Sequence, residues 1–233
     1  MNNVVLRTEG LAKTFTLHLQ GGVRMPVLSG IRLDVRAGEC VVLSGPSGVG
    51  KSTLMRSLYG NYRAEFGRIL VRHRGEMVDL AAAEPRTILD VRQQTLGSVS
   101  QFLRVVPRVP ALDVVAEVLV GRGIPQQDAR DTATALLLRL NIPSRLHGLP
   151  PATFSGGEQQ RINLARGFIA NHPVLLVDEP TASLDAENCA VVVAMINQAK
   201  ARGTAIIAIC HDAAVRQAIA DRLFELTPLQ DAA

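Results

Sequence analysis

The fold of this chain is decided by residues 45–52, which read Gly45-Pro46-Ser47-Gly48-Val49-Gly50-Lys51-Ser52. The stretch fits the pattern G-x-x-x-x-G-K-[ST], and it lies between a short apolar run at 40–43 and a predicted helix at 51–59. Glycines in such a loop let backbone N–H groups converge on phosphate oxygens at a helix N-terminus. A chain of this length matches the pattern by chance in about one case in a hundred. We therefore predict a phosphate-binding loop of the P-loop NTPase type, and not merely a tight turn.

The chemistry of this loop assigns roles to its last residues. Lys51 is expected to reach the β- and γ-phosphates of a nucleotide, and the Ser52 hydroxyl is expected to ligate Mg²⁺. ATP and Mg²⁺ are thus the expected substrate and cofactor. The predicted ATP-binding residues of this segment are Gly45, Pro46, Ser47, Gly48, Val49, Gly50, Lys51, Ser52 and Thr53.

An acidic pair supplies the matching element. The apolar run at 174–177 predicts a buried strand, and Asp178 and Glu179 follow it directly. Open α/β sheets bind ligands at the carboxyl ends of their strands, so Asp178 is expected to hold the metal through its water shell. Glu179 is suited to orient the attacking water. Alone, such a pair is more typical of a helix cap, but together with the P-loop the catalytic interpretation is favoured.

The remaining pattern predicts an α/β fold in a single domain, 1–233. Strands alternate with helices, which indicates a mostly parallel sheet covered on both faces. The segment 111–147 changes to helical periodicity, within a helical subdomain at about 101–170. The expected strands cover 4–8, 31–35, 40–43, 68–72, 77–80, 96–100, 174–177 and 204–209, and the further helices cover 86–94, 157–170, 186–199 and 212–219.

Composition excludes several classes of protein. No apolar run approaches the ~20 residues of a spanning helix, and the N-terminus does not resemble a secretory signal, so we expect a cytoplasmic protein without direct membrane insertion. Cys40, Cys189 and Cys210 are odd in number and far apart, which favours buried thiols over disulfides or zinc. The net charge is only +4 and aromatic residues are 3% of the chain, so no nucleic acid is expected as a partner.

The segment Phe154-Ser155-Gly156-Gly157-Glu158-Gln159 decides the class of P-loop protein. Ser155 and Glu158 have the spacing of a capping box, whereas two consecutive glycines suit a backbone that approaches a phosphate closely. In these residues the chain resembles the ATP-binding cassette (ABC) family, whose signature loop follows an L-S-G-G-Q pattern. Phe154 replaces the leucine, and Glu158 precedes the glutamine. The resemblance implies the fold of an ABC ATPase nucleotide-binding domain, with a mostly parallel sheet core, an antiparallel β subdomain and a helical subdomain.

The same resemblance implies further site residues. Gln101 matches a glutamine that reads magnesium and the γ-phosphate, and His211 matches the γ-phosphate histidine; capping or packing is the alternative for His211. Phe15 matches the aromatic residue that stacks on adenine, with a place in the core as the alternative. The implied groups are the catalytic set Glu179, His211 and Gln101, the metal set Ser52, Gln101 and Asp178, the signature loop Ser155, Gly156, Gly157 and Glu158, and the D-loop Ser183, Leu184 and Asp185, which crosses to a partner subunit.

The family also implies a mechanism. In ABC dimers, the signature loop of one subunit covers the ATP held by the P-loop of the other. Positioning and charge stabilisation supply most of the catalysis in phosphoryl transfer, so dilute monomer is expected to hydrolyse ATP weakly. The residues leave open whether the unit is a homodimer or a heterodimer with another ABC protein, and whether GTP replaces ATP.

A narrower resemblance rests on residues 100–108, 153–161 and 211–216. These look like the PhnL family, the ABC proteins of the carbon–phosphorus lyase pathway, and the similarity runs over nearly the whole chain. It implies carbon–phosphorus lyase subunits as partners and a role in phosphonate metabolism. That family is associated with the ribose 1-methylphosphonate 5-triphosphate synthase step, in which an alkylphosphonate replaces the adenine of ATP. The catalytic residues recognised here are placed for the γ-phosphate, so this chain is expected to be the ATP-driven conformational element of the assembly.

Two other functions stay open. One is the nucleotide-binding subunit of an ABC transporter of the lipoprotein-release or macrolide-export type. The other is a soluble cassette protein acting on nucleic acid or ribosomes, although such proteins usually carry two cassettes. The segment 101–110 is apolar and contains two prolines, so we expect part of it to stay exposed until a partner covers it. The alternative is an ordinary packed loop.

Overall fold

The central sheet of the computed structural model is five-stranded and wholly parallel, in the order β6-β7-β8-β3-β9. Its strands are β3 Cys40–Ser44, β6 Leu96–Val99, β7 Val174–Asp178, β8 Ala205–Ile209 and β9 Arg222–Glu225. Alternate residues of β3 enter different cores: Val41 and Leu43 face one, and Cys40 and Val42 face the other. Both faces are thus buried, which explains why these strands are continuous apolar runs. The predicted parallel sheet is confirmed.

A second, antiparallel sheet has the order β2-β1-β4-β5. Its strands are β1 Val4–Leu17, β2 Val23–Arg36, β4 Phe66–His73 and β5 Glu76–Asp79. The short strands predicted at 4–8 and 31–35 are only the ends of two 14-residue strands. Register shifts interrupt β1 between Thr8 and Leu11 and between Lys13 and Thr14. These bulges break the alternation that marks a strand, so the sequence pattern indicated only part of each.

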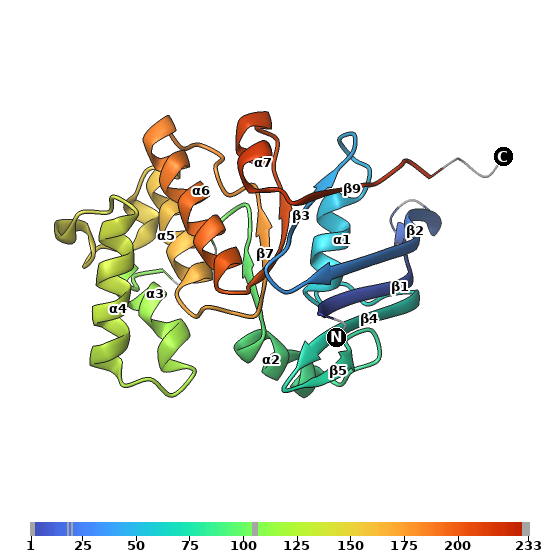
Figure 1. Ribbon diagram of the computed structural model, residues 1–233, viewed down its shortest axis with the longest axis horizontal. Coiled ribbons are helices and arrows are strands. Elements are labelled where there is room, and N and C mark those ends of the chain that lie inside the picture. The colour runs from blue at the N-terminus through green and yellow to red at the C-terminus, as the bar shows by residue number, and fades with distance from the viewer. Residues whose placement is uncertain (1–2, 18, 20, 104–106, 230–233) are drawn as a thin grey trace.

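The helices form layers around the parallel sheet (Figure 1). Helix α1 lies between the two sheets, where Leu54 and Leu58 are fully buried. The opposite face is covered by α5, α6 and α7, and α3 and α4 lie at the end away from the antiparallel sheet. The bounds are α1 Lys51–Leu58, α2 Pro85–Gln94, α3 Ala111–Val120, α4 Gln126–Arg139, α5 Gly156–Phe168, α6 Ala186–Ala201 and α7 Ala213–Ile219, with short 3₁₀ turns at Ser144–Leu146 and Pro151–Thr153.

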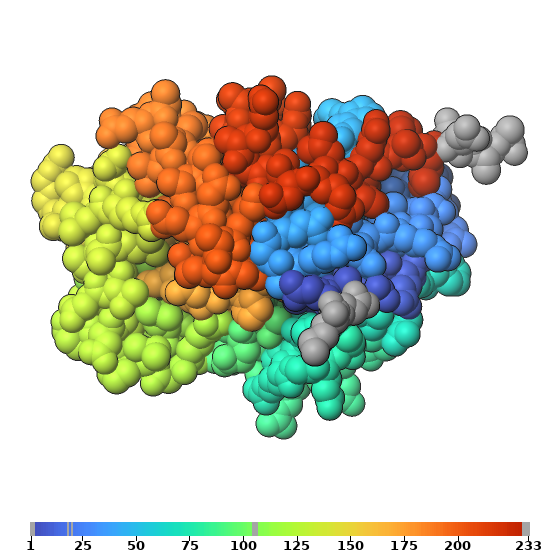
Figure 2. Space-filling view, in the orientation of Figure 1, coloured from blue at the N-terminus to red at the C-terminus, as the bar shows by residue number. Residues whose placement is uncertain are grey.

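The structure describes residues 3–17, 19, 21–103 and 107–229. The predictions for the N-terminal residues 1–2 and for residues 104–106 of the segment 101–110 lie outside this range. In Figure 2 the helical region, in yellow-green, forms one end of the molecule, and its surface adjoins that of α6, in orange. Within the described ranges, the helices are too short or too polar to cross a membrane. Cys40 and Cys210 are buried and Cys189 is half-buried, and all three are free thiols.

Candidate functional site

The P-loop joins β3 to α1, and its glycines are required by geometry. Gly45 has a φ of +130°, and a Cβ there would lie 2.5 Å from the carbonyl oxygen of Leu226. Gly50, the N-cap of α1, has a φ of +105°. Both positions therefore exclude a residue with a side chain. The first turn of α1 contains no acidic residue, and the N-cap makes no side-chain hydrogen bond, so the N–H groups at this helix end are available to an anion.

Lys51 turns back into the loop. Its Nζ donates hydrogen bonds to the carbonyl oxygens of Gly45 at 2.7 Å and Pro46 at 2.9 Å. The ammonium group is therefore held inside the curve of the loop, where phosphate oxygens would compete with the two carbonyls for its protons. This placement fits the predicted role of Lys51.

The three residues predicted to serve the metal meet at one cavity of about 290 Å³. Ser52 comes from α1, Asp178 from the end of β7, and Gln101 from the segment after β6; all three line the cavity. All offer oxygen, the ligand that Mg²⁺ prefers, and Mg²⁺ usually takes only one or two protein ligands besides phosphates and water. The donor set therefore fits a magnesium–nucleotide complex. Other lining residues are Met55, Arg56, Tyr59, Asn61, Ser98, Ser100, Phe102, Asn163, Arg166 and Leu176.

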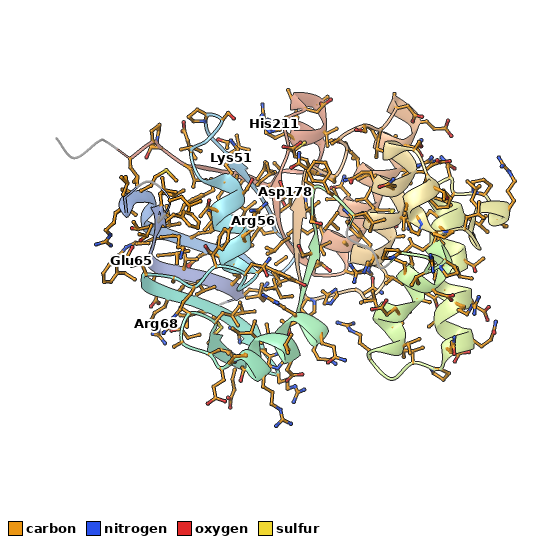
Figure 3. The ribbon with its side chains drawn as sticks, turned by 180° about the vertical axis from the view of Figure 1, so that it is seen from behind. Lys51, Arg56, Glu65, Arg68, Asp178 and His211 are labelled. Atoms are coloured by element: carbon orange, nitrogen blue, oxygen red, sulfur yellow. The ribbon has the colours of Figure 1, made fainter. Side chains whose placement is uncertain are left out.

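The electrostatics of Asp178 also fit a cation. Burial raises the pKa of its carboxyl group, and the neighbouring Glu179 carboxylate raises this pKa further, while Arg56 and His211 oppose the shift. Figure 3 shows Lys51, Arg56, Asp178 and His211 on the same side of the molecule, around α1 and the ends of the parallel strands. A bound cation would stabilise the ionised form of Asp178.

Glu179 and His211 form a direct pair. His211 Nε2 lies 2.9 Å from Glu179 Oε1, within ion-pair distance. Glu179 has a φ of +51°, a left-handed conformation that is costly for a residue other than glycine and that clusters at functional sites. Its backbone is fixed at both ends, because its N–H donates to the Ile209 carbonyl at 3.0 Å and Gln160 Nε2 donates to its own carbonyl at 3.1 Å. No role was predicted for Gln160 from the sequence. The one sequence feature that pointed to it is its position directly after the signature segment 154–159.

Phe15 lies beside a second depression, of about 950 Å³, which includes Pro46–Val49 in its lining. On β2, Met25 pairs with Phe15 and lines that depression, as does Leu17 on β1. The Phe15 ring itself packs edge-on against Tyr62, with ring centroids 5.1 Å apart. Its adenine-stacking role stays a prediction, and the structure shows an aromatic contact that the sequence did not indicate.

The signature turn, residues 155–157, has features of both interpretations made from the sequence, the helix cap and the exposed backbone. The capping box is complete: Glu158 N–H donates to Ser155 Oγ at 3.3 Å, and Ser155 N–H donates to Glu158 Oε2 at 2.9 Å. The Ser155 N–H and the Ser155 hydroxyl both donate to the Glu158 carboxylate, and these bonds lower its pKa. Yet Ser155 and Gly156 are exposed, and a Cβ added at Gly156 would meet no described atom within 4 Å. Packing within the described part of the chain therefore does not require glycine at position 156.

The predicted D-loop is also partly structural. Ser183 is exposed and has a φ of +63°. Asp185 is the N-cap of α6, and its side chain accepts a hydrogen bond from the Asn188 N–H at 2.8 Å. Farther along, Phe102 is 73% exposed, and Leu103 packs against the helical core. The expectation that part of the segment 101–110 stays exposed is thus met at Phe102.

Comparisons with known proteins agree with this geometry. A family model described as ABC transporter matches residues 28–182. An uncharacterized ABC transporter ATP-binding protein of Mycobacterium tuberculosis is 34% identical over 91% of this chain and 62% of its own length. The macrolide export ATP-binding/permease protein MacB of Brucella abortus is 36% identical over 95% of this chain and 33% of its own length. The chain thus spans less than two thirds of these curated relatives.

Solved structures match the fold. The dimeric structure of MJ0796, a bacterial ABC transporter cassette, superposes with a TM-score of 0.86 and 24% identity over 95% of this chain and 94% of that chain. A post-hydrolysis dimeric structure of the same cassette bound to ADP and Pi gives a TM-score of 0.86 at 23% identity, again over 95% and 94% of the two chains.

Proposed function

The chain belongs to the ABC transporter family, and from that premise we propose that it binds and hydrolyses MgATP as one half of a closed pair of cassettes. The observation that carries the proposal is an incomplete site. The P-loop, the acidic pair and His211 converge within one chain, whereas Ser155 and Gly156 of the signature turn are exposed and open to an outside ligand. A second cassette would supply that turn over the first cassette's nucleotide.

Each residue then has a defined task. Lys51 exchanges its loop carbonyls for the β- and γ-phosphate oxygens, and the α1 N–H groups hold the phosphates. Ser52, Asp178 and Gln101 would hold Mg²⁺, which when bound neutralises charge that develops on the transferring phosphoryl group. Glu179 orients the attacking water and accepts its proton.

His211 restrains Glu179 until the γ-phosphate arrives. In the structure its Nε2 lies 2.9 Å from the Glu179 carboxylate. When a γ-phosphate reaches the site, its oxygens offer His211 an alternative acceptor, and Glu179 is released toward water. Hydrolysis then removes the phosphate that joins the two cassettes.

Within this role we propose a place in the carbon–phosphorus lyase system, where ATP-driven closure changes the conformation of the lyase assembly. The support is the resemblance of residues 100–108, 153–161 and 211–216 to the PhnL family. The associated chemistry is the formation of alkylphosphonate ribose triphosphate, with glycosyl transfer left to other subunits. A second candidate, a transport ATPase of the macrolide-export type, is favoured by the 36% identity to the Brucella abortus protein.

A pull-down separates these candidates. Glu179→Gln protein should keep nucleotide binding, lose most hydrolysis and stay closed in MgATP with its partners attached. Recovery of carbon–phosphorus lyase subunits supports the proposed pathway. Recovery of membrane permease subunits alone would replace it with the transport function, and both results would leave the ATPase assignment intact.

A further inference from the structure

The signature turn and the D-loop touch each other within one chain. A Cβ atom added at Gly157 would lie 2.8 Å from the carbonyl oxygen of Ser183, which is closer than van der Waals contact allows. Ser183 has a φ of +63°, so the loop bends sharply at this point. Because the two backbones are in contact, a displacement of one segment is passed to the other.

Arg161 reinforces this contact from the next turn of α5, because its Nε donates to the Gly157 carbonyl oxygen at 3.4 Å. Its guanidinium donates to the carbonyl oxygens of Asn141 at 2.9 Å and Leu140 at 3.2 Å, and to Asn188 Oδ1 at 3.3 Å. Leu140 is the C-cap of α4, so the cation lies at the negative end of that helix dipole. Arg161 thus joins three helices: α4, its own α5, and α6 through Asn188.

Asn188 carries the connection on to the D-loop. The residue is almost fully buried, with 8% of its surface exposed. Its Oδ1 accepts from Arg161 and from Asn141 Nδ2, while its Nδ2 donates to Asp185 Oδ1 at 2.8 Å. The backbone N–H of Asn188 donates to the same oxygen at 2.8 Å. Asp185 is therefore held twice by one residue, and that residue is fixed in turn by Arg161.

We propose that Arg161 and Asn188 are positioning residues that join the Ser155–Gly157 turn and the Ser183–Asp185 loop into one unit. Both segments then meet the neighbouring cassette in a fixed mutual arrangement. Closure therefore carries a smaller entropic cost than it would if each segment had to be ordered separately. The inference rests on the proposed function, because it concerns how two cassettes close. It adds two residues that touch neither nucleotide nor metal.

The chain offers a matched control. Arg139 Nη2 donates to Gln198 Oε1 at 2.8 Å, so this pair also joins α4 to α6. It does so without bonding to the signature turn or the D-loop. Arg139→Ala removes an exposed side-chain hydrogen bond between the same two helices and leaves the proposed unit intact.

The experiment measures closure directly. In a Glu179→Gln background, sedimentation in MgATP gives the dimer dissociation constant for the parent, Arg161→Lys, Asn188→Ala, their combination and Arg139→Ala. Lysine keeps the charge but cannot reach the carbonyls and Asn188 together. We expect each of the two single variants to weaken dimerisation about tenfold, the size of one hydrogen bond to a charged group. The double variant should weaken dimerisation no more than either single variant does, because Arg161 and Asn188 act through the same series of hydrogen bonds.

Two further readouts separate positioning from folding. ATP binding to dilute monomer should match that of Arg139→Ala, and in the active background KM for ATP should hold while kcat falls. The inference is overturned if both variants dimerise like Arg139→Ala, or if their losses add. If Asn188→Ala does not fold, Arg161→Lys decides alone. A parent that stays monomeric in MgATP would instead refute the proposed function.

Discussion

Gly156→Ala separates the two roles of the signature turn. Gly156 is the first residue of α5, it is exposed, and an added Cβ would meet no described atom within 4 Å. In the isolated chain, alanine should therefore be tolerated and should stabilise the fold by about 0.4–1 kcal/mol, because it restricts the unfolded chain. In the closed pair, the same methyl group would lie where the turn approaches the neighbouring nucleotide.

The expected loss follows from that crowding. Inserting a methyl group into a closely packed contact costs about 1–3 kcal/mol, which corresponds to a roughly 5- to 150-fold weaker closure and a matching fall in ATPase rate at low protein concentration. Urea unfolding of the nucleotide-free protein and ATPase assays over a range of protein concentrations measure the two effects separately.

Two glycine controls sharpen this test. Gly148→Ala also meets open space, so it should raise stability by the same amount but leave the ATPase rate and its concentration dependence unchanged. Gly157→Ala, which collides with the Ser183 carbonyl, should lower both stability and the ATPase rate. If Gly156→Ala kept full activity and an unchanged concentration dependence, the turn would be only a helix cap, and the inference of a nucleotide-facing role would fail.

Three further predictions concern the nucleotide site and the fold. Lys51→Ala should abolish detectable ATP binding in a fluorescence titration without lowering stability, since its bonds in the structure go only to two carbonyls of its own loop; unchanged affinity would contradict the placement of the phosphates. Glu179→Gln should bind MgATP normally but hydrolyse it roughly 100-fold or more slowly in single-turnover assays, because the general base is lost; a near-normal rate would assign that role elsewhere. Burial lowers the pKa of His172 to about 4, below the pKa of about 6.5 that a histidine has in the unfolded chain. The neutral imidazole therefore contributes to stability above about pH 6.5. This contribution, of up to about 3 kcal/mol, is lost as the pH falls toward 4. Urea unfolding at pH 7 and pH 4.5 should show this loss, and His172→Gln should reduce it; an equal loss in the variant would place the proton uptake on other groups.

The sequence predicted best what is continuous along the chain. Residues 40–52 contain the strand, loop and helix start that the structure shows, and the short apolar run before Asp178 forms the predicted buried strand. The capping box was visible for the same reason, since Ser155 and Glu158 are three residues apart. Such local patterns carry their own geometry.

What the sequence did not indicate depends on partners distant in the chain. Strand β9 is only four residues long and carries Arg222 and Glu225 at its ends, so it has no apolar run to mark it. It forms because β3 offers a free edge. Gln160 and Asn188 make their hydrogen bonds only when the fold brings α5, β7 and α6 together. The spacing of these residues in the sequence does not indicate such contacts.

The most direct test is the sedimentation of Glu179→Gln protein at micromolar concentration, with and without MgATP. We predict a monomer without nucleotide and a dimer with MgATP, reverting to monomer when Gly156 is also replaced by alanine. A species that stays monomeric at saturating MgATP, with nucleotide demonstrably bound, would contradict the claim that two cassettes complete each other's site.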